Sequence, residues 1–134
     1  MYDQAELDRI AANQPPFARL LGLHIVCASA DRVEAELAVT DELANRNGKL
    51  HGGAIVALAD NLGGTATFLN ITPEQGTTTL ESKTNFIRPV ELGDTVRAVA
   101  VPVHRGRKTM VWQITMTRGD GKVAALITQT QMVL

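Results

Sequence analysis

The sequence predicts a single α+β domain over residues 1–134, in which an antiparallel sheet is wrapped around one long central helix. Two observations predict this fold. Residues 53–69 are too apolar to face water on any side, so they should form a buried helix. The chain that follows contains four β-like segments joined by short turns, which is typical of antiparallel strands. A sheet that curls around the helix would bury the apolar surface of both.

The first half of the chain predicts a helical lead-in, a β-hairpin and the central helix. Polar and apolar residues alternate at helical spacing near the N-terminus until Pro15 and Pro16 interrupt the pattern. Two apolar, partly β-branched segments follow, and charged residues alternate through the second, so this hairpin should have one solvent-facing side. The predicted segments are a lead-in over 1–16, strands over 23–28 and 33–39, a polar loop over 41–50, and a helix from 52 or 53 to about 69.

The second half predicts four strands that form a meander. Gly and Asp residues separate the segments, and two of the separators, 105–107 and 119–121, are short enough for tight hairpin turns. The predicted strands cover residues 77–87, 95–104, 108–118 and 122–133.

Composition excludes several classes of function. Thirteen basic and 14 acidic residues leave a net charge of −1, without the basic excess of proteins that bind nucleic acid or anionic membranes. Cys27 is the only cysteine, so we expect no disulfide, no structural zinc site and a reducing, cytoplasmic location. The N-terminus lacks the pattern of a secretory signal, and Asp60, Asn61 and several glycines mark the apolar segment as a core helix rather than a membrane span.

Helical spacing divides the central helix into an apolar face and a face of small residues around Asp60. The small face lets a ligand, a partner subunit or another backbone approach the carboxylate closely. The alternative is an ordinary exposed stripe on which glycines only adjust helix packing. The predicted core face comprises Ile55, Leu58, Ala59, Leu62, Ala66 and Leu69, and the small face Gly53, Ala57, Asp60, Gly64 and Thr67.

The start of this helix and Asp60 together suggest acyl-transfer chemistry. His51, Gly52 and Gly53 would expose backbone N–H groups at the positive end of the helix dipole, which suits a carbonyl oxygen. His51 could equally be a hydrogen-bonding loop residue. The sequence contains no nucleophilic-serine elbow, no phosphate loop and no metal-ligand spacing. Because an aspartate is a weak base and nucleophile, its substrate should be intrinsically reactive, as a thioester is.

Two segments resemble the hotdog-fold acyl-CoA thioesterases of the phenylacetate-degradation (PaaI) type. One runs from Asn45 through Asn47, Gly48 and the His-Gly-Gly motif to Asp60; the other covers residues 85–90 and the Gly-Asp pair at 93–94. The resemblance spans residue 17 to the C-terminus. It implies a homodimer, paired into a tetramer, with active sites at the dimer interface, acyl-CoA as substrate, and no metal or organic cofactor.

The resemblance also implies residue roles. Gly52 would donate its N–H to the thioester carbonyl, His51 would shape the turn, and Asn45 would hold the carbonyl or the attacking water. Asp60 would act as nucleophile or general base on substrate held by the neighbouring subunit, and Thr79 would orient water.

Candidate contacts to coenzyme A are basic. Arg88, Arg105, Arg107 and Lys108 could pair with its phosphates, although a solvated turn is the alternative for the last three, and Gly53 could add a backbone contact. Gly64 stands where some relatives have Ser or Thr, so an auxiliary hydroxyl would have to come from another residue. The candidates for that hydroxyl are Thr65, Thr67 and Thr79.

The expected function is therefore hydrolysis of a small aryl or medium-chain acyl-CoA. Two alternatives stay open: a non-catalytic acyl-CoA sensor or carrier on the same fold, and a hotdog dehydratase or hydratase. The second is disfavoured because His51 sits in the glycine turn, where it is poorly placed to act as a base.

Overall fold

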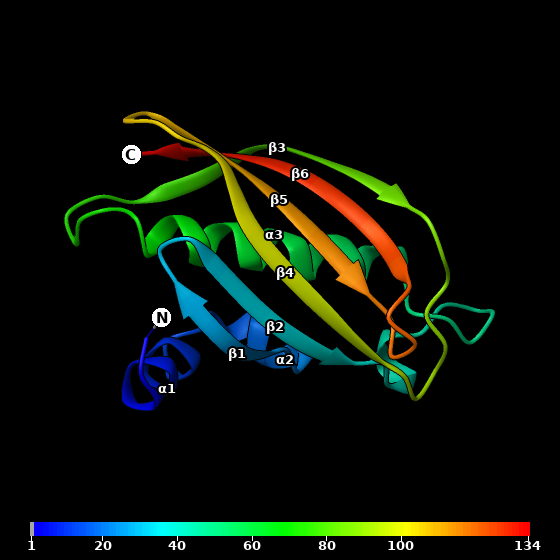
Figure 1. The fold of residues 1–134 in the computed structure, drawn as a ribbon. Coiled ribbons are helices and arrows are strands. Elements are labelled where there is room, and N and C mark those ends of the chain that lie inside the picture. Colours follow the sequence, from blue (N-terminus) through cyan, green and yellow to red (C-terminus); the bar gives the residue numbers. More distant parts are fainter. Residues whose placement is uncertain (1) are drawn as a thin grey trace.

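The computed structural model describes residues 2–134 and shows a six-stranded antiparallel sheet curled around α3 (Gly52–Phe68). The helix lies across the concave side of the sheet, while α1 (Gln4–Ala12) and α2 (Pro16–Leu21) lie near the β1 edge (Figure 1). The predicted α+β class and the order of elements are confirmed. Met1, where the predicted lead-in begins, lies outside the described residues.

Local sequence sets the ends of the short helices. Asp3 caps α1 through a capping box, in which its carboxylate accepts from the Glu6 N–H at 2.9 Å and Glu6 accepts from the Asp3 N–H at 3.1 Å. Pro16 begins α2, and Gly22 ends it in the left-handed conformation (φ 79°), which a residue with a Cβ adopts only at a cost.

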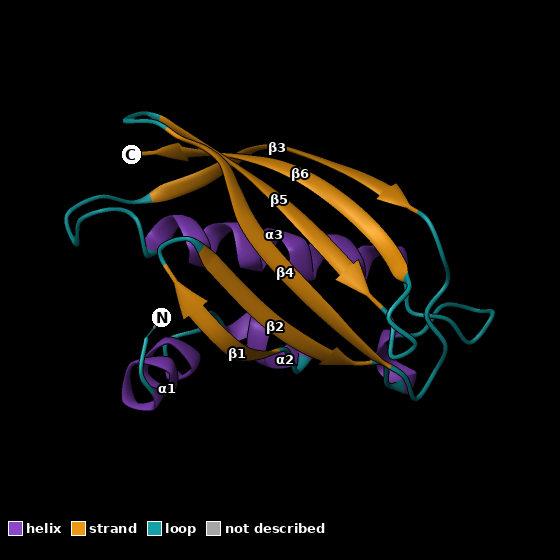
Figure 2. Ribbon diagram, viewed as in Figure 1, coloured by secondary structure: helices purple, strands orange, loops and turns teal. Residues whose placement is uncertain are grey.

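The strands match the predicted segments closely (Figure 2). Their bounds are β1 (His24–Ser29), β2 (Arg32–Ala38), β3 (Thr77–Phe86), β4 (Thr95–Arg105), β5 (Thr109–Thr117) and β6 (Val123–Val133), and the 3-10 helix η1 covers Asp41–Leu43.

The predicted four-strand meander is wrong at its first step. The order in the sheet is β1-β2-β4-β5-β6-β3, so β3 pairs with β6 at the far edge and not with β4. Both edges of β4 are already occupied, one by β2 and the other by β5. The segment after β3 therefore carries the chain from the edge of the sheet past the ends of β6 and β5 before β4 begins (Figure 1).

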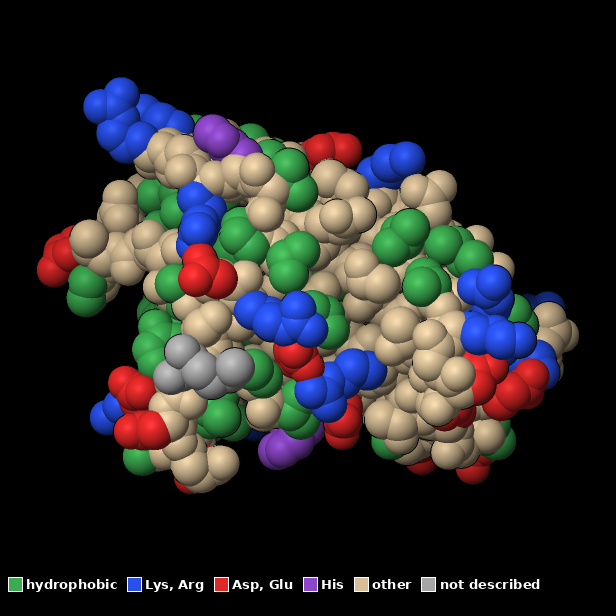
Figure 3. All heavy atoms as spheres, in the orientation of Figure 1, with side chains coloured by type: hydrophobic (Ala, Val, Ile, Leu, Met, Phe, Trp, Pro, Cys, Tyr) green, Lys and Arg blue, Asp and Glu red, His purple; other side chains and the backbone are tan. Residues whose placement is uncertain are grey.

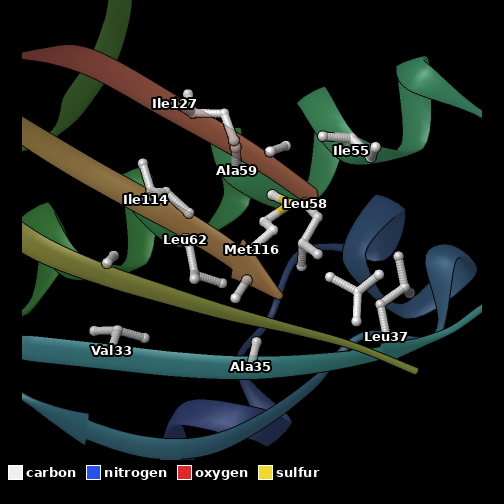
Figure 4. Packing of buried hydrophobic residues seen from close by; sticks show 14 of the residues in the cluster. Val33, Ala35, Leu37, Ile55, Leu58, Ala59, Leu62, Ile114, Met116 and Ile127 are labelled. Atoms are coloured by element: carbon white, nitrogen blue, oxygen red, sulfur yellow. The ribbon is translucent and has the colours of Figure 1, made fainter. Parts of the chain in front are cut away.

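The core lies between α3 and the concave face of the sheet. Leu58, Ala59 and Leu62 are fully buried, and they pack towards Ile114 and Ile127 of the central strands (Figure 4). The predicted apolar face of the helix is thereby confirmed, except that Leu69 is only partly buried. At about 25 cal/mol per Å² of apolar surface, this packing is the main source of the fold's stability.

Thr67 is a correction to the predicted small face. Its side chain is fully buried, donates to the Gly63 carbonyl at 2.9 Å and accepts from the indole N–H of Trp112 at 2.8 Å. A buried indole N–H needs an acceptor, and the threonine hydroxyl supplies it. Thr67 therefore belongs to the core and cannot serve as the auxiliary hydroxyl beside Asp60.

Within residues 2–134, no helix is both long enough and apolar enough to cross a membrane.

Candidate active site

The N-terminus of α3 presents one unengaged backbone donor. His51 caps the helix, and its Nδ1 accepts a hydrogen bond from the Gly53 N–H at 2.8 Å. The His51 carbonyl accepts from the N–H groups of Ala54 and Ile55. Among the described residues, none accepts from the Gly52 N–H. Gly52 is therefore the residue whose N–H can bind a carbonyl oxygen, whereas the N–H of Gly53 already serves the turn.

Gly52 lies in a cavity of about 560 Å³ between the loop before α3 and the end of β3. A Cβ at this position would lie 3.3 Å from the Phe86 ring, so a larger residue here would crowd that ring. Asn45 also lines the cavity, and its Oδ1 accepts from the N–H groups of Asn47 (2.9 Å) and Lys49 (3.1 Å). The carboxamide thus holds the loop in shape.

Asp60 lines a second cavity of about 580 Å³, bounded by α3, β3 and the segment that joins α1 to α2. The residue is exposed in the single chain, yet its carboxylate is held. Thr79 donates to Oδ1 at 2.7 Å from β3, and Gln129 donates to the same oxygen at 2.8 Å from β6. No described residue donates to Oδ2, which is left for a substrate or a water molecule.

Thr79 is the one of the three predicted hydroxyl candidates that contacts Asp60. The Thr65 hydroxyl instead donates to Gln14 Oε1 at 3.4 Å, and Thr67 is in the core. Gly64 has no atom within 4 Å of where its Cβ would be, so this part of the cavity is open beside the carboxylate.

Sequence reasoning missed two residues of this site, Gln129 and Gln131. Both are buried, at 0% and 1% exposure, on the face of β6 that meets α3. A signal was available, because Ile127, Gln129, Gln131 and Val133 alternate along one face of a strand. Positions 128 and 130 are also polar, so both faces of the strand look polar in the sequence and the alternation does not show which face is buried.

One protomer does not bring Gly52 and Asp60 together. They are eight residues apart on one helix, which corresponds to about 12 Å along its axis. Each lines a different cavity. Within one protomer, the Gly52 N–H and the Asp60 carboxylate therefore do not meet at one point.

The predicted cationic residues fall into two groups at opposite ends of the sheet. Arg88 lines the Gly52 cavity and donates to the Val123 carbonyl at 2.7 Å. Arg105 binds Asp31 at 2.7 Å at the other end, where it ties the β1–β2 turn to the end of α3 through Asn70.

Arg107 and Lys108 are exposed in the β4–β5 turn, and Lys and Arg side chains gather at the tip of this hairpin (Figure 3). Within one protomer, this turn and Arg88 cannot bind the same phosphate, because they lie beyond opposite ends of the long β4 strand (Figure 1).

A strong ion-pair cluster lies outside these cavities, across β2 and β4. Burial raises the pKa of the Glu34 carboxyl, but hydrogen bonds from Arg97 and Arg32 outweigh that effect and lower the pKa below its ordinary value. The cluster fastens two adjacent strands. Across residues 2–134, no group of three or more His, Cys, Asp or Glu side chains is arranged to hold a metal ion.

Comparison with known proteins identifies the family. Residues 47–125 match the family described as the thioesterase superfamily. Over 104 residues the chain is 35% identical to the 1,4-dihydroxy-2-naphthoyl-CoA hydrolase of Escherichia coli, a match that covers 78% of this chain and 76% of that enzyme. Over 82 residues the chain is also 44% identical to PM0788 of Pasteurella multocida, a protein named as an esterase. This match covers 61% of this chain and 58% of that protein.

Solved structures share the fold over nearly the whole chain. A crystal structure of a mutant of thioesterase PA1618 from Pseudomonas aeruginosa aligns with a TM-score of 0.88 at 31% identity, covering 100% of this chain and 95% of that one. The smu.793 protein of Streptococcus mutans, solved bound to acetyl CoA, aligns at 0.78 with 29% identity over 84% of this chain and 88% of that one. The sheet wrapped around its helix is thus the hotdog fold, and the chain belongs to the thioesterase superfamily.

Proposed function

We propose that the protein hydrolyses acyl-CoA thioesters, with Asp60 as nucleophile or general base and the Gly52 N–H as the donor to the thioester carbonyl. The observation that carries the proposal is the carboxylate of Asp60, held at Oδ1 by two donors and open at Oδ2. An unengaged N–H at the start of a buried helix is suited to stabilise the oxyanion that forms during attack.

In the general-base form of the reaction, Asp60 takes a proton from water while the water oxygen attacks the thioester carbon. The carbonyl oxygen becomes an oxyanion at the Gly52 N–H, the C–S bond breaks, and coenzyme A leaves as the thiolate, which is then protonated. In the nucleophilic form, Oδ2 attacks the thioester carbon, the C–S bond breaks and coenzyme A leaves as the thiolate, which gives a mixed anhydride between Asp60 and the acyl group. Water then hydrolyses this anhydride, which releases the free acid and regenerates the carboxylate. His51 shapes the donor turn, and Thr79 fixes the carboxylate or a water molecule beside it.

The distance between Gly52 and Asp60 supports a homodimer with shared sites. The edge strand β3 offers an unpaired edge ten residues long, on which Leu80 and Phe86 are 56% and 59% exposed. Such an edge pairs readily with another strand, and here the available strand is that of a second copy. We propose that the dimers pair further into tetramers, and that the protein works in the cytoplasm on a soluble substrate.

The acyl group is proposed to be a small aryl or medium-chain acyl group. The Asp60 cavity has apolar walls from Ile10, Pro15, Phe68 and Leu69, and Gly64 leaves space beside the carboxylate. Two comparisons support coenzyme A as the other half of the substrate: one relative is named a hydrolase of a naphthoyl-CoA, and one structural neighbour was solved with acetyl CoA. No metal or organic cofactor enters the reaction.

The proposal is tested by thiol release from a panel of aryl and aliphatic acyl-CoAs. Asp60→Asn keeps the shape of the side chain, so it should leave folding and acyl-CoA binding near normal and lower kcat by about 10³-fold or more, as expected when a catalytic base or nucleophile is lost. Asp8→Asn makes the same change on an exposed carboxylate of α1 and should retain full turnover. Full turnover by Asp60→Asn would remove Asp60 from the mechanism, and wild-type binding without thiol release would indicate a carrier.

A second comparison locates the coenzyme A phosphates. Arg88→Ala should raise KM for acyl-CoA several-fold, while kcat for the same acyl group stays close to wild type. The double substitution Arg107→Ala with Lys108→Ala tests the β4–β5 turn in the same way, and Arg105→Ala tests whether a residue engaged with Asp31 also contributes. If KM is unchanged in one of these variants, the replaced residue does not bind the coenzyme A phosphates.

A further inference from the structure

We propose that Gln129 is a positioning residue that fixes the rotamer of Asp60, with Gln131 orienting Gln129 and Gly63 providing the space for it. The inference rests on the proposed function and extends it to residues that do not contact substrate. Asp60 is exposed to the cavity beside α3, where a carboxylate without partners would sample several rotamers. Gln129 approaches it from the interior of the sheet and holds Oδ1 at 2.8 Å.

The hydrogen bonds around Asp60 all run in one direction. Thr77 donates its hydroxyl proton to Gln131 Oε1 at 2.9 Å. The amide of Gln131 then donates to Gln129 Oε1 at 2.7 Å and to Thr79 Oγ1 at 2.8 Å. Gln129 and Thr79 in turn donate to Asp60.

This direction determines the orientation of each group. Because Gln129 Oε1 accepts from Gln131, the amide nitrogen of Gln129 must face Asp60. Because Thr79 Oγ1 also accepts from Gln131, its single proton is left for Asp60. Both donors of the carboxylate are therefore set by one buried residue, Gln131, which does not itself touch the carboxylate.

The glycine at position 63 is explained by Gln129. A Cβ at Gly63 would lie 1.7 Å from Gln129 Oε1 and 2.8 Å from its amide carbon. The Gln129 amide therefore packs against the helix in the space that a side chain at position 63 would occupy. Glycine in the middle of a helix destabilises it relative to alanine. That cost is consistent with a site that needs the amide in this place.

Stability alone does not require two buried amides here. Replacing both partners of a buried hydrogen bond by apolar groups of similar shape is often neutral or stabilising. An apolar pair at 129 and 131 would fill the same space between β6 and α3, as Ile127 and Val133 do on the same face. An apolar pair could not donate a hydrogen bond to Asp60. We therefore infer that the two amides are present to hold the Asp60 carboxylate.

The first test is Gln129→Met, which keeps the length of the side chain and removes the amide. We expect kcat for the best acyl-CoA to fall about 10- to 100-fold, the scale of a displaced catalytic group, with KM within about two-fold of wild type. The matched control is Gln113→Met, the same change at an exposed position of the neighbouring strand β5, which should retain wild-type kcat. Circular dichroism and the thermal midpoint report on folding in both variants.

The second test is a double-mutant cycle between positions 63 and 129. Gly63→Ala should lower kcat to a similar extent, because the new methyl group displaces the Gln129 amide. In a Gln129→Ala background that amide is already absent, so adding Gly63→Ala should cost little further activity. The two effects are then strongly non-additive, whereas independent effects on two sites would add.

Each outcome decides between the proposals. Wild-type kcat in Gln129→Met, or additive losses in the cycle, overturns the positioning role while leaving Asp60 catalysis intact. A loss of activity that only follows the loss of folded protein also overturns it. If the wild-type protein releases no thiol from any acyl-CoA, the proposed function itself fails, and this inference fails with it.

Discussion

Replacing Thr67 by Val would test how the buried end of α3 is held. The substitution keeps the shape of the side chain but removes the hydroxyl that accepts from Trp112 at 2.8 Å and donates to the Gly63 carbonyl at 2.9 Å. Both Thr67 and Trp112 are fully buried, so water cannot replace the lost acceptor. An indole N–H left without a partner in the interior costs about 1–3 kcal/mol.

The cost converts to a measurable shift in the thermal midpoint. An unfolding entropy of about 2.1 cal/mol/K per residue gives about 0.28 kcal/mol/K for 134 residues, so a loss of 1–3 kcal/mol lowers Tm by about 4–11 °C. Differential scanning calorimetry or thermal circular dichroism measures this. Variants should be compared at one protein concentration, because self-association stabilises a fold by mass action.

Two controls make the result interpretable. Thr128→Val is the same change at an exposed position of β6 and should shift Tm by little, as surface substitutions usually do. In a Trp112→Phe background there is no indole N–H to satisfy, so Thr67→Val should cost much less than in the wild type. An unchanged Tm for Thr67→Val, or an equal cost in both backgrounds, would refute the assigned hydrogen bond.

Three further predictions concern an ion pair in the sheet, the end of α2 and the β3 edge. The lowered pKa of Glu34 means that its ion pairs stabilise the fold fully above the unfolded value of 4.5, and that this contribution is lost as the pH falls through the folded pKa. Glu34→Gln should therefore flatten the acid side of a plot of Tm against pH, and an unchanged acid slope would contradict the assignment. Gly22→Ala should destabilise the fold by about 1 kcal/mol, measured by urea unfolding, because φ is 79° there; a neutral result would mean that the turn relaxes. Leu80→Lys, on the exposed β3 edge, should halve the mass measured by light scattering while the chain stays folded, and an unchanged mass would place the subunit contact elsewhere.

Most of the local structure could be predicted from the sequence because it depends on local patterns. The apolar period of residues 53–69, the capping position of Asp3 and the tight turns near 106 and 120 each fix an element within a few residues. The place of β3 could not be predicted in this way. Its partner β6 begins almost 40 residues after β3 ends. The edges of β4 are taken by β2 and β5, and no local pattern shows which of the remaining edges β3 joins.

The candidate site was predictable where its residues form a continuous motif and not where distant strands complete it. His51, Gly52 and Asp60 lie on one helix, and the structure places them at its start and on its open face. Thr67 was assigned to the wrong face because its environment depends on Trp112, 45 residues later. Gln129 and Gln131 escaped notice because the register of β6 decides which of four successive polar residues point inward.

The order of strands in the sheet has a consequence for synthesis on the ribosome. A nascent chain that has just emerged with α3 and β3 already contains the proposed base and its hydroxyl partner, but the strand that supports them both comes after all the others. Until β6 is translated, β3 has no neighbour in its own chain to pair with and the apolar helix lacks part of its cover. Hydrolytic competence should therefore arise abruptly, with the final strand, and a single proteolytic nick within that strand should abolish it.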